Sequence, residues 1–234
     1  MINWKVLWDA FYTQVFKLEG YKTILTGLKN TLIIAIVGFI IGIVVGSLIA
    51  IIQLLPDSKP AKVLNAVAKV YVGIFRGTPI LVQLLVGWFV IKPMFGITDA
   101  NAVAWATVIY GLNSSAYASE IVRGGILSVD KGQMEAGRSL GLSYAKTMIK
   151  IVIPQALKNS IPAIGNELIS LVKETSVAGL MSVTDLQVAF KLQDTLYNPL
   201  ICYLALAVVY IILVVLFTVI VKLIERRLRT SDKR

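Results

Sequence analysis

Long apolar segments alternate with short basic segments along this chain, and each apolar segment is about as long as a membrane helix. The clearest covers residues 32–55 without one charged side chain. It exceeds the ~20 residues needed to cross the hydrocarbon core of a bilayer. Four more segments predict membrane helices, at about 77–92, 102–121, 155–172 and 200–221. We therefore expect an all-α membrane protein with five transmembrane helices.

The fourth of these segments is the weakest. It contains Lys158, Asn166 and Glu167, so a hydropathy profile alone would miss it. Pro154, just ahead of it, supports a helix here, because proline fits the first turn of a helix and disrupts its interior. The second segment is short, and we expect it to begin near the break Arg76-Gly77-Thr78-Pro79.

The composition agrees with a membrane protein. Hydrophobic residues make up 57% of the chain and charged residues 15%, against roughly 45–50% apolar residues in soluble domains. The net charge of +10 does not indicate a nucleic-acid partner, because the basic residues gather between the apolar segments. The chain has no histidine, which excludes histidine-based metal sites and Ser-His or Cys-His catalysis. Cys202 is the single cysteine, so no intrachain disulfide can form.

The basic residues also predict the orientation, because loops on the cytoplasmic side carry an excess of lysine and arginine. One set of alternate loops is rich in them: Lys59, Lys62, Lys69, Arg76; Arg123, Lys131, Arg138, Lys146, Lys150; Lys222, Arg226, Arg227, Arg229, Lys233, Arg234. The other set has fewer: Lys5, Lys17, Lys22, Lys29; Lys92; Lys173, Lys191. We expect an external N-terminus, a membrane domain over residues 31–222 and a basic cytoplasmic tail over 223–234.

Two further patterns concern the first part of the chain. Residues 1–30 space their aromatic side chains three to four apart, which favours an amphipathic helix in the external interface; a frayed terminus is the alternative. In the first predicted span Gly38, Gly42 and Gly46 recur every four residues. They predict a face for close helix packing, although glycine is also simply common in membrane helices.

A polar stretch between the third and fourth spans carries the most specific motif. Glu135, Ala136, Gly137 and Gly141 are followed by Ile153-Pro154. We predict a short helix over 133–140, with Glu135 at its positive end. Gly141 then supplies the positive φ of a helix end, and Ser143 caps a second helix.

This spacing resembles the motif E-A-A-x3-G-x9-I-x-L-P of binding-protein-dependent ABC importers, with Gly137 and Ile153 as conservative departures. Stretches over about residues 20–225 are similar to permeases of polar amino-acid importers, of type I with a methionine-importer-like membrane domain. They are 75–79, 113–126, 131–137 and 173–176.

The resemblance implies a function. Residues 131–154 would form the cytoplasmic coupling region that docks on an ABC ATPase dimer. Further expected partners are an extracytoplasmic amino-acid-binding protein, a second permease subunit, identical or homologous, and membrane lipid of the bacterial cytoplasmic membrane. The chain has no G-x4-G-K-[ST] phosphate loop, so ATP and Mg²⁺ are expected on the partner ATPase. No cofactor and no catalytic residue is predicted in this chain.

Polar residues inside the spans are the candidates for cargo contact, because ionisable groups at membrane depth usually face a partner or a wet cavity. Asn113 and Tyr117 share one helical face with Glu120, and Asn166, Glu167 and Ser170 share another. Glu167 could pair with the positive group of an amino acid, which favours polar and especially basic cargo. Alternatively it pairs with Lys158 or another span and is structural.

Two questions stay open on the sequence alone. At the break, Gly77 and Pro79 predict a kink or helix start, while Arg76 either takes part in it or anchors at the headgroups. A self-contained channel or exporter without an ATPase is the alternative function, and a membrane scaffold is a third. The coupling motif argues against a channel, and the intramembrane Glu167 argues weakly against a scaffold.

Overall fold

A computed structural model describes residues 4–55, 58–99, 101–194 and 199–230, and every regular element within these ranges is helical. The predicted all-α class is thereby confirmed. In chain order the elements are α1 (Trp4–Tyr12), the π-helical turn η1 (Thr13–Lys17), α2 (Gly20–Gln53), α3 (Lys59–Gly77), α4 (Ile80–Val86), η2 (Gly87–Ile91), α5 (Lys92–Met94), α6 (Ala102–Leu127), α7 (Lys131–Ser139), α8 (Tyr144–Thr147), η3 (Met148–Val152), α9 (Ile153–Glu174), η4 (Thr175–Met181), α10 (Leu186–Lys191) and α11 (Pro199–Thr230).

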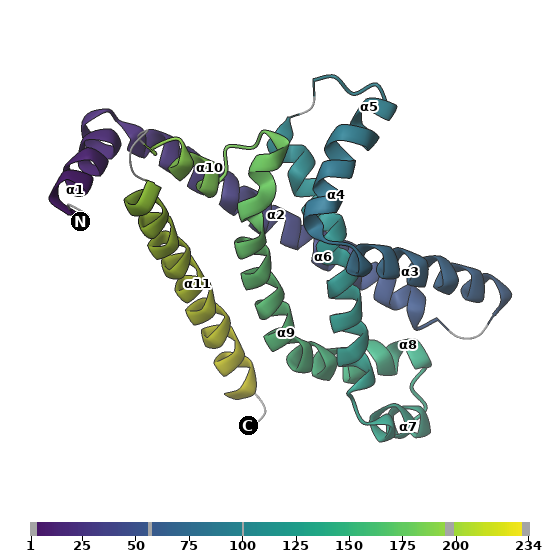
Figure 1. Cartoon of the computed structure of the whole chain (residues 1–234). Helices are drawn as coiled ribbons and strands as arrows, with labels where there is room; N and C mark the ends of the chain where they lie inside the picture. The colour runs from purple at the N-terminus through teal and green to yellow at the C-terminus, as the bar shows by residue number, and fades with distance from the viewer. Residues whose placement is uncertain (1–3, 56–57, 100, 195–198, 231–234) are drawn as a thin grey trace.

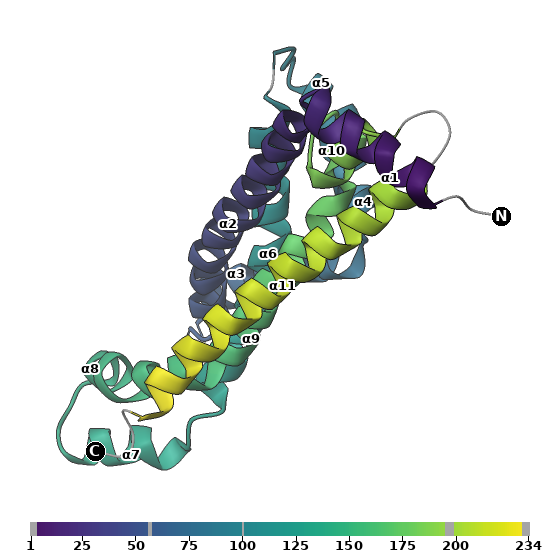
Figure 2. The ribbon, with the colours of Figure 1, turned by 90° about the vertical axis from the view of Figure 1, so that its left-hand side faces the viewer.

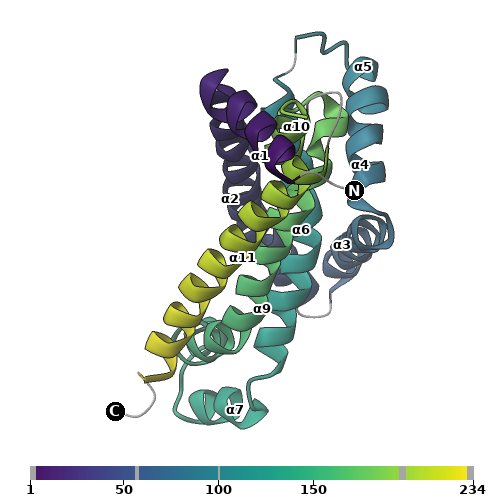
Figure 3. The same cartoon turned by 60° about the vertical axis from the view of Figure 1, so that its left-hand side comes forward.

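The long helices α2, α6, α9 and α11 form an elongated bundle (Figure 1). Elements α1, α5 and α10 gather at one end, together with the N-terminal side of α2 (Figure 2). The α7–α8 hairpin and the C-terminal end of α11 lie at the other end (Figure 3). The two ends of the bundle therefore carry different parts of the chain.

Two helices of the described ranges, α2 and α11, are each long and apolar enough to cross a membrane. A third crossing is possible if α3 and α4–α5, which are bent by 104° at their junction, count as one broken span. Helices α6 and α9 are not apolar enough to be counted with them. In α6 this polarity has a structural reason. Its Ser114, Ser115 and Ser119 lie fully inside the protein, where no apolar lipid-facing side chain is required.

Helix α2 begins ahead of the first predicted span. It starts at Gly20, so residues 20–30 are helical and continuous with the apolar run that begins at residue 32. A short helical segment over residues 4–17 precedes it and ends before Glu19, which takes a left-handed φ of 58°. Phe11 of this segment packs against the apolar cluster between α2 and α11. Residues 231–234 of the predicted tail lie outside the described residues.

The tightest packing joins α2 to α6. Gly38, Gly42 and Gly46 are all buried in this contact, which confirms the predicted packing face. A Cβ atom on Gly46 would lie 2.6 Å from the carbonyl oxygen of Ser115 and 2.7 Å from Cβ of Ala118. Real Cβ atoms do not approach backbone this closely, so the two helix axes can come together only because Gly46 has no side chain.

A polar seam holds α10 against α2. The amide of Asn30 donates to the carbonyl of Thr184 at 2.8 Å, and Thr31 Oγ1 accepts from the backbone N–H of Leu186 at 3.1 Å. Asp185 caps α10 by accepting from the N–H of Val188 at 2.7 Å. Burial raises the pKa of the Asp185 carboxyl to about 6. This seam fixes η4 and the adjoining end of α9.

Candidate functional site

The predicted helical hairpin is present as α7 and α8. Gly141 ends the turn between them with φ of +81°, and Ser143 Oγ accepts from the N–H of Lys146 at 3.3 Å, as expected. The N-terminal end differs. Helix α7 begins at Lys131, and Asp130 caps it by accepting from the N–H of Gly132 at 2.7 Å. Glu135 therefore lies in the middle of α7, exposed to solvent, rather than at its positive end.

Gly137 sets how closely the two helices of the hairpin approach. A Cβ on this residue would lie 2.5 Å from Cγ2 of Thr147, which is fully buried. The hairpin is tied to the base of α9 by a hydrogen bond from Gln155 Nε2 to Gln133 Oε1 at 3.3 Å. Gly137, which stands at the second alanine of the E-A-A motif, thus leaves room for the side chain of Thr147.

The hairpin continues into α9 without a break. Helix α8, the π-helical turn η3 and α9 follow one another directly, and Pro154 lies in the first turn of α9 with Ile153 before it. Apolar side chains nevertheless stay exposed on the hairpin and η3, namely Leu140 at 82%, Tyr144 at 48% and Ile149 at 64%. A displacement of the hairpin would act directly on the base of α9.

A polar pocket of about 380 Å³ lies between α6 and α9. All five residues predicted from the sequence as cargo contacts line it, together with Ala163 and Glu174: Asn113, Tyr117, Asn166, Glu167 and Ser170. A larger hollow of about 690 Å³ follows along the same two helices toward the hairpin end and shares Ala163 with the pocket. Two helices that are adjacent in the bundle thus bring together residues far apart in the sequence.

Glu167 is partly buried in this pocket and has a defined partner. Its Oε1 accepts a hydrogen bond from Ser114 Oγ at 2.8 Å. Ser114 belongs to α6 and is fully buried, so the contact joins two of the long helices. The Glu167 carboxylate is thereby held at the wall of the pocket by a residue of α6.

Asn113 and Tyr117 line the pocket but also have partners beyond it. Asn113 Nδ2 donates to Gln83 Oε1 at 3.0 Å, and the residue is 3% exposed. The guanidinium of Arg76 lies 5.4 Å from the ring centroid of Tyr117 and contacts Glu120 Oε2 at 3.7 Å. Arg76 thus contacts two residues of α6 close to the break. The sequence had left open whether this side chain takes part in the break or anchors at the lipid headgroups.

Sequence reasoning missed Glu174, Ser114 and Gln83. Glu174 lies seven residues after Glu167, which is two helical turns and therefore the same face of α9; this periodicity could have identified it. Ser114 has no such signal. It lies next to the predicted polar face of α6, and nothing in the sequence shows that its partner is Glu167 of another helix. Gln83 lies in the middle of an apolar segment, which is itself an indication of a buried partner.

An elongated helical membrane protein with a polar pocket among its inner helices and an exposed hairpin at one end has the parts of a transport subunit. The sequence model of the family described as "Binding-protein-dependent transport system inner membrane component" matches residues 42–230. This chain belongs to that family.

Named relatives cover most of the chain. The arginine transport system permease protein ArtQ of Bacillus subtilis (strain 168) is 37% identical over 211 residues, covering 89% of this chain and 94% of the relative. The L-cystine transport system permease protein TcyB of the same organism is 38% identical over 206 residues, covering 86% and 85%. A putative glutamine transport system permease protein GlnP of Rickettsia bellii (strain RML369-C) is 36% identical over 209 residues, covering 89% and 94%.

Two solved structures of ABC transporters also resemble this chain. The chain matches one described as "Crystal structure of an amino acid ABC transporter with histidines" with a TM-score of 0.81 and 34% identity, covering 91% of this chain and 97% of that one. A structure of the MetNI methionine ABC transporter in an inward-facing conformation matches with a TM-score of 0.67, covering 97% and 99%. At 21% identity the second match concerns the fold alone.

Proposed function

We propose that this chain is the membrane-spanning subunit of an ATP-driven importer for polar amino acids, with a preference for basic ones. The observation that carries the proposal is the pocket between α6 and α9, where two carboxylates, Glu167 and Glu174, face the same space as neutral polar groups. The relatives named above are permeases of arginine, cystine and glutamine transport systems.

The spacing of the two carboxylates favours a cargo with two positive groups. Seven residues along a helix correspond to a rise of ~10 Å. One carboxylate can pair with the α-ammonium group and the other with a basic side chain, while Asn166 and Ser170 offer neutral hydrogen-bonding groups between them. A neutral amino acid would use only one of the two ion pairs.

Energy for transport would enter through the hairpin. Its exposed residues Glu135, Ala136 and Leu140 lie at the end of the bundle, where a separate ABC ATPase dimer binding ATP and Mg²⁺ could dock. Because α8 runs through η3 into α9, closure of the ATPase would tilt the helix that carries Glu167 and Glu174. The larger hollow below the pocket would then serve as the route toward the cytoplasm.

The proposed topology has five crossings, made by α2, the bent α3–α5 segment, α6, α9 and α11. The N-terminus is external and the C-terminus cytoplasmic, in the bacterial cytoplasmic membrane. In support, the N-terminal helix and the end of α11 lie at opposite ends of the bundle (Figure 1). An extracytoplasmic binding protein would deliver the cargo, and a second permease subunit, identical or homologous, would complete the pore.

Reconstitution of the chain with its ATPase and binding protein in vesicles tests the proposal. We expect uptake of a basic amino acid that requires ATP. Uptake that proceeds without the ATPase would instead identify a self-contained channel, and no uptake of any amino acid by the full complex would contradict the proposal.

Coupling through the hairpin can be tested separately with Gly141. A complex that contains the Gly141→Val variant should still hydrolyse ATP through its ATPase subunits but lose most of its uptake, because a β-branched residue resists the positive φ of this turn. Gly141→Asn is the matched control, since asparagine tolerates left-handed backbone and nothing lies within 4 Å of a Cβ here. Equal uptake by both variants would mean that the turn does not transmit closure.

A further inference from the structure

The break between α3 and α4 interrupts the backbone hydrogen bonds of the bent segment that packs beside α6. Helix α3 ends at Gly77, Thr78 and Pro79 are extended, and α4 starts at Ile80. The last carbonyls of a helix have no partner within the helix, and in a membrane they need one from elsewhere in the protein. Thr78 Oγ1 supplies one, donating to the carbonyl of Ile74 at 2.8 Å.

Gln83, one turn into α4, supplies the next. Its Nε2 lies 2.8 Å from the carbonyl of Phe75, 3.0 Å from that of Thr78 and 2.9 Å from Thr78 Oγ1. Its Oε1 meanwhile accepts from Asn113 Nδ2 at 3.0 Å. The amide nitrogen of Gln83 therefore closes the break, and its amide oxygen holds α6.

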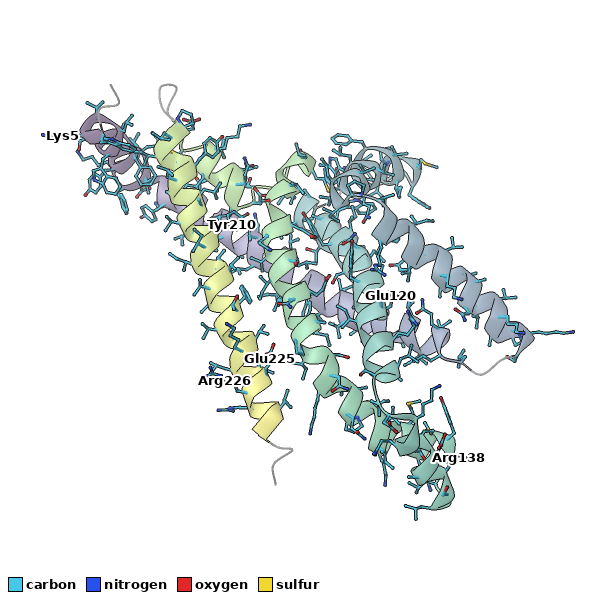
Figure 4. All side chains as sticks on the ribbon, turned by 60° about the horizontal axis from the view of Figure 1, so that its bottom comes forward. Lys5, Glu120, Arg138, Tyr210, Glu225 and Arg226 are labelled. Carbon is cyan, nitrogen blue, oxygen red and sulfur yellow. The ribbon has the colours of Figure 1, made fainter. Side chains whose placement is uncertain are left out.

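A second contact fixes the other side of the bend to the same helix. Arg76, in the last turn of α3, contacts Glu120 Oε2 at 3.7 Å and stacks over Tyr117. Glu120 is itself held by Arg123 Nη2 at 2.9 Å. Asn113, Tyr117 and Glu120 follow at steps of four and three on one face of α6, and Figure 4 shows Glu120 on the side of α6 that faces α3.

We infer that Gln83 is a positioning residue for the pocket. By closing the α3–α4 break and binding Asn113, it fixes the bend against α6 and so holds the Asn113–Tyr117 side of the pocket in place. Asn113 acts in this arrangement as the receiver of that contact rather than as a cargo ligand. The inference rests on the proposed function, since it assigns a role toward the same pocket.

A binding assay that does not depend on uptake tests this role. Cys202 is the single cysteine and is buried, so Cys202→Ser gives a background in which Ala163→Cys, on the pocket wall, is the one thiol. In the assembled permease–ATPase complex, arginine should slow labelling of this thiol by a soluble maleimide. The measured quantity is the arginine concentration that halves the labelling rate.

Gln83→Leu should raise this concentration roughly tenfold, because a broken buried hydrogen bond of this kind typically costs a factor of that order. Asn113→Leu leaves the break closed by Gln83 and should produce a similar rise. The double variant should be no worse than the stronger single variant, since both substitutions remove the same hydrogen bond, the one from Asn113 Nδ2 to Gln83 Oε1. Val82→Leu, on the exposed side of the same turn, is the matched control and should leave the value unchanged.

The outcomes separate the inference from the proposed function. If arginine does not protect Ala163→Cys in the parent complex, the pocket does not bind this cargo and the proposed function fails. If arginine protects the parent and Gln83→Leu equally well, the positioning role is wrong. Additive losses in the double variant would also overturn it, because they would make Asn113 an independent cargo contact. Should Gln83→Leu fail to assemble, Asn113→Leu remains a test, since Tyr71 still binds the Leu112 carbonyl and keeps α3 on α6. Unchanged arginine protection in Asn113→Leu would overturn the positioning role.

Discussion

The two faces of α6 are similar in hydropathy but differ in the size of their side chains and in the partners that they contact. One face meets α2 through glycines and small side chains, with Ser114, Ser115 and Ala118 fully buried. The other presents Asn113, Tyr117 and Glu120 to the α3–α4 bend and the pocket. Neither face is strongly apolar, so α6 fails a hydropathy test even though it lies at the centre of the protein. A helix enclosed by other helices is selected for fit and for polar partners, whereas a lipid-facing helix is selected for apolar surface.

The faces should also differ in how they tolerate substitution. On the α2 side a new Cβ at Gly46 meets backbone atoms within 3 Å. On the pocket side about 380 Å³ of space is available. Changes on the first face should therefore act on folding, and changes on the second should act on cargo.

The largest effect is expected from Gly46→Leu, which would force α2 and α6 apart. Overpacking costs ~1–3 kcal/mol and occasionally more, a large share of the total stability of a typical domain. We expect little folded protein, measured as monodisperse yield and melting temperature in detergent. Gly73→Leu on α3, where nothing lies within 4 Å of a Cβ, is the control and should be near normal. A normal melting temperature for Gly46→Leu would contradict the assignment of this face to stability.

Glu167→Gln should have the next largest effect, confined to transport. It keeps size and hydrogen bonding and removes the charge, so uptake of a basic amino acid should fall ~tenfold or more, as expected for a hydrogen-bonded ion pair of ~1.5–3 kcal/mol. A neutral amino acid should lose less. Glu19→Gln, an exposed carboxylate paired with Lys22, is the matched control in the same uptake assay. Equal losses for both cargoes would assign Glu167 to structure.

Gly42→Ala links the two faces and should have an intermediate effect. Its Cβ would lie 2.6 Å from Ser114 Oγ, the group that binds Glu167. The new methyl group should reduce uptake of a basic amino acid severalfold with the complex still assembled, because overpacking against Ser114 costs ~1–3 kcal/mol and the displaced serine also weakens its hydrogen bond to Glu167. Gly38→Ala is the control, since its closest contact is 3.3 Å. Identical transport by the two variants would show that the faces act independently.

The smallest effect is expected from Ser114→Ala, which deletes the hydrogen bond to Glu167 and little else. Uptake of a basic amino acid should fall by a few-fold, in line with ~1 kcal/mol for one hydrogen bond. Ser119→Ala is the comparison, because its hydroxyl bonds only the carbonyl of Ala116 in its own helix. A larger loss for Ser119→Ala would mean that volume on the packed face, not the bond to Glu167, is what matters.

Much of the fold could be predicted from local pattern. The apolar runs at 32–55, 102–121 and 200–221 lie within the long helices α2, α6 and α11, whereas the helix α3 ahead of the break was not predicted. The four-residue glycine spacing identified the face of α2 that packs. Gly141 and Ser143 have the predicted turn and cap geometry. These features depend on residues near one another in the chain, so they can be predicted from the sequence. The early start of α2 and the cap at Asp130 were not predicted, because helix ends are decided by small local differences in capping.

The sequence by itself determined the class of the protein, the place of the Glu135–Gly141 motif and the polar residues within the apolar segments, since charge and hydrogen-bonding groups in apolar spans are costly wherever they lie. Only the tertiary structure decided what those groups meet. It placed Ser114 against Glu167, Gln83 against Asn113 and Arg76 against Glu120. Each pair joins residues at least thirty positions apart, and the contact depends on how two helices cross. The crossing is set by packing at glycines such as Gly46, so the geometry of the pocket follows from interactions on the opposite face of α6.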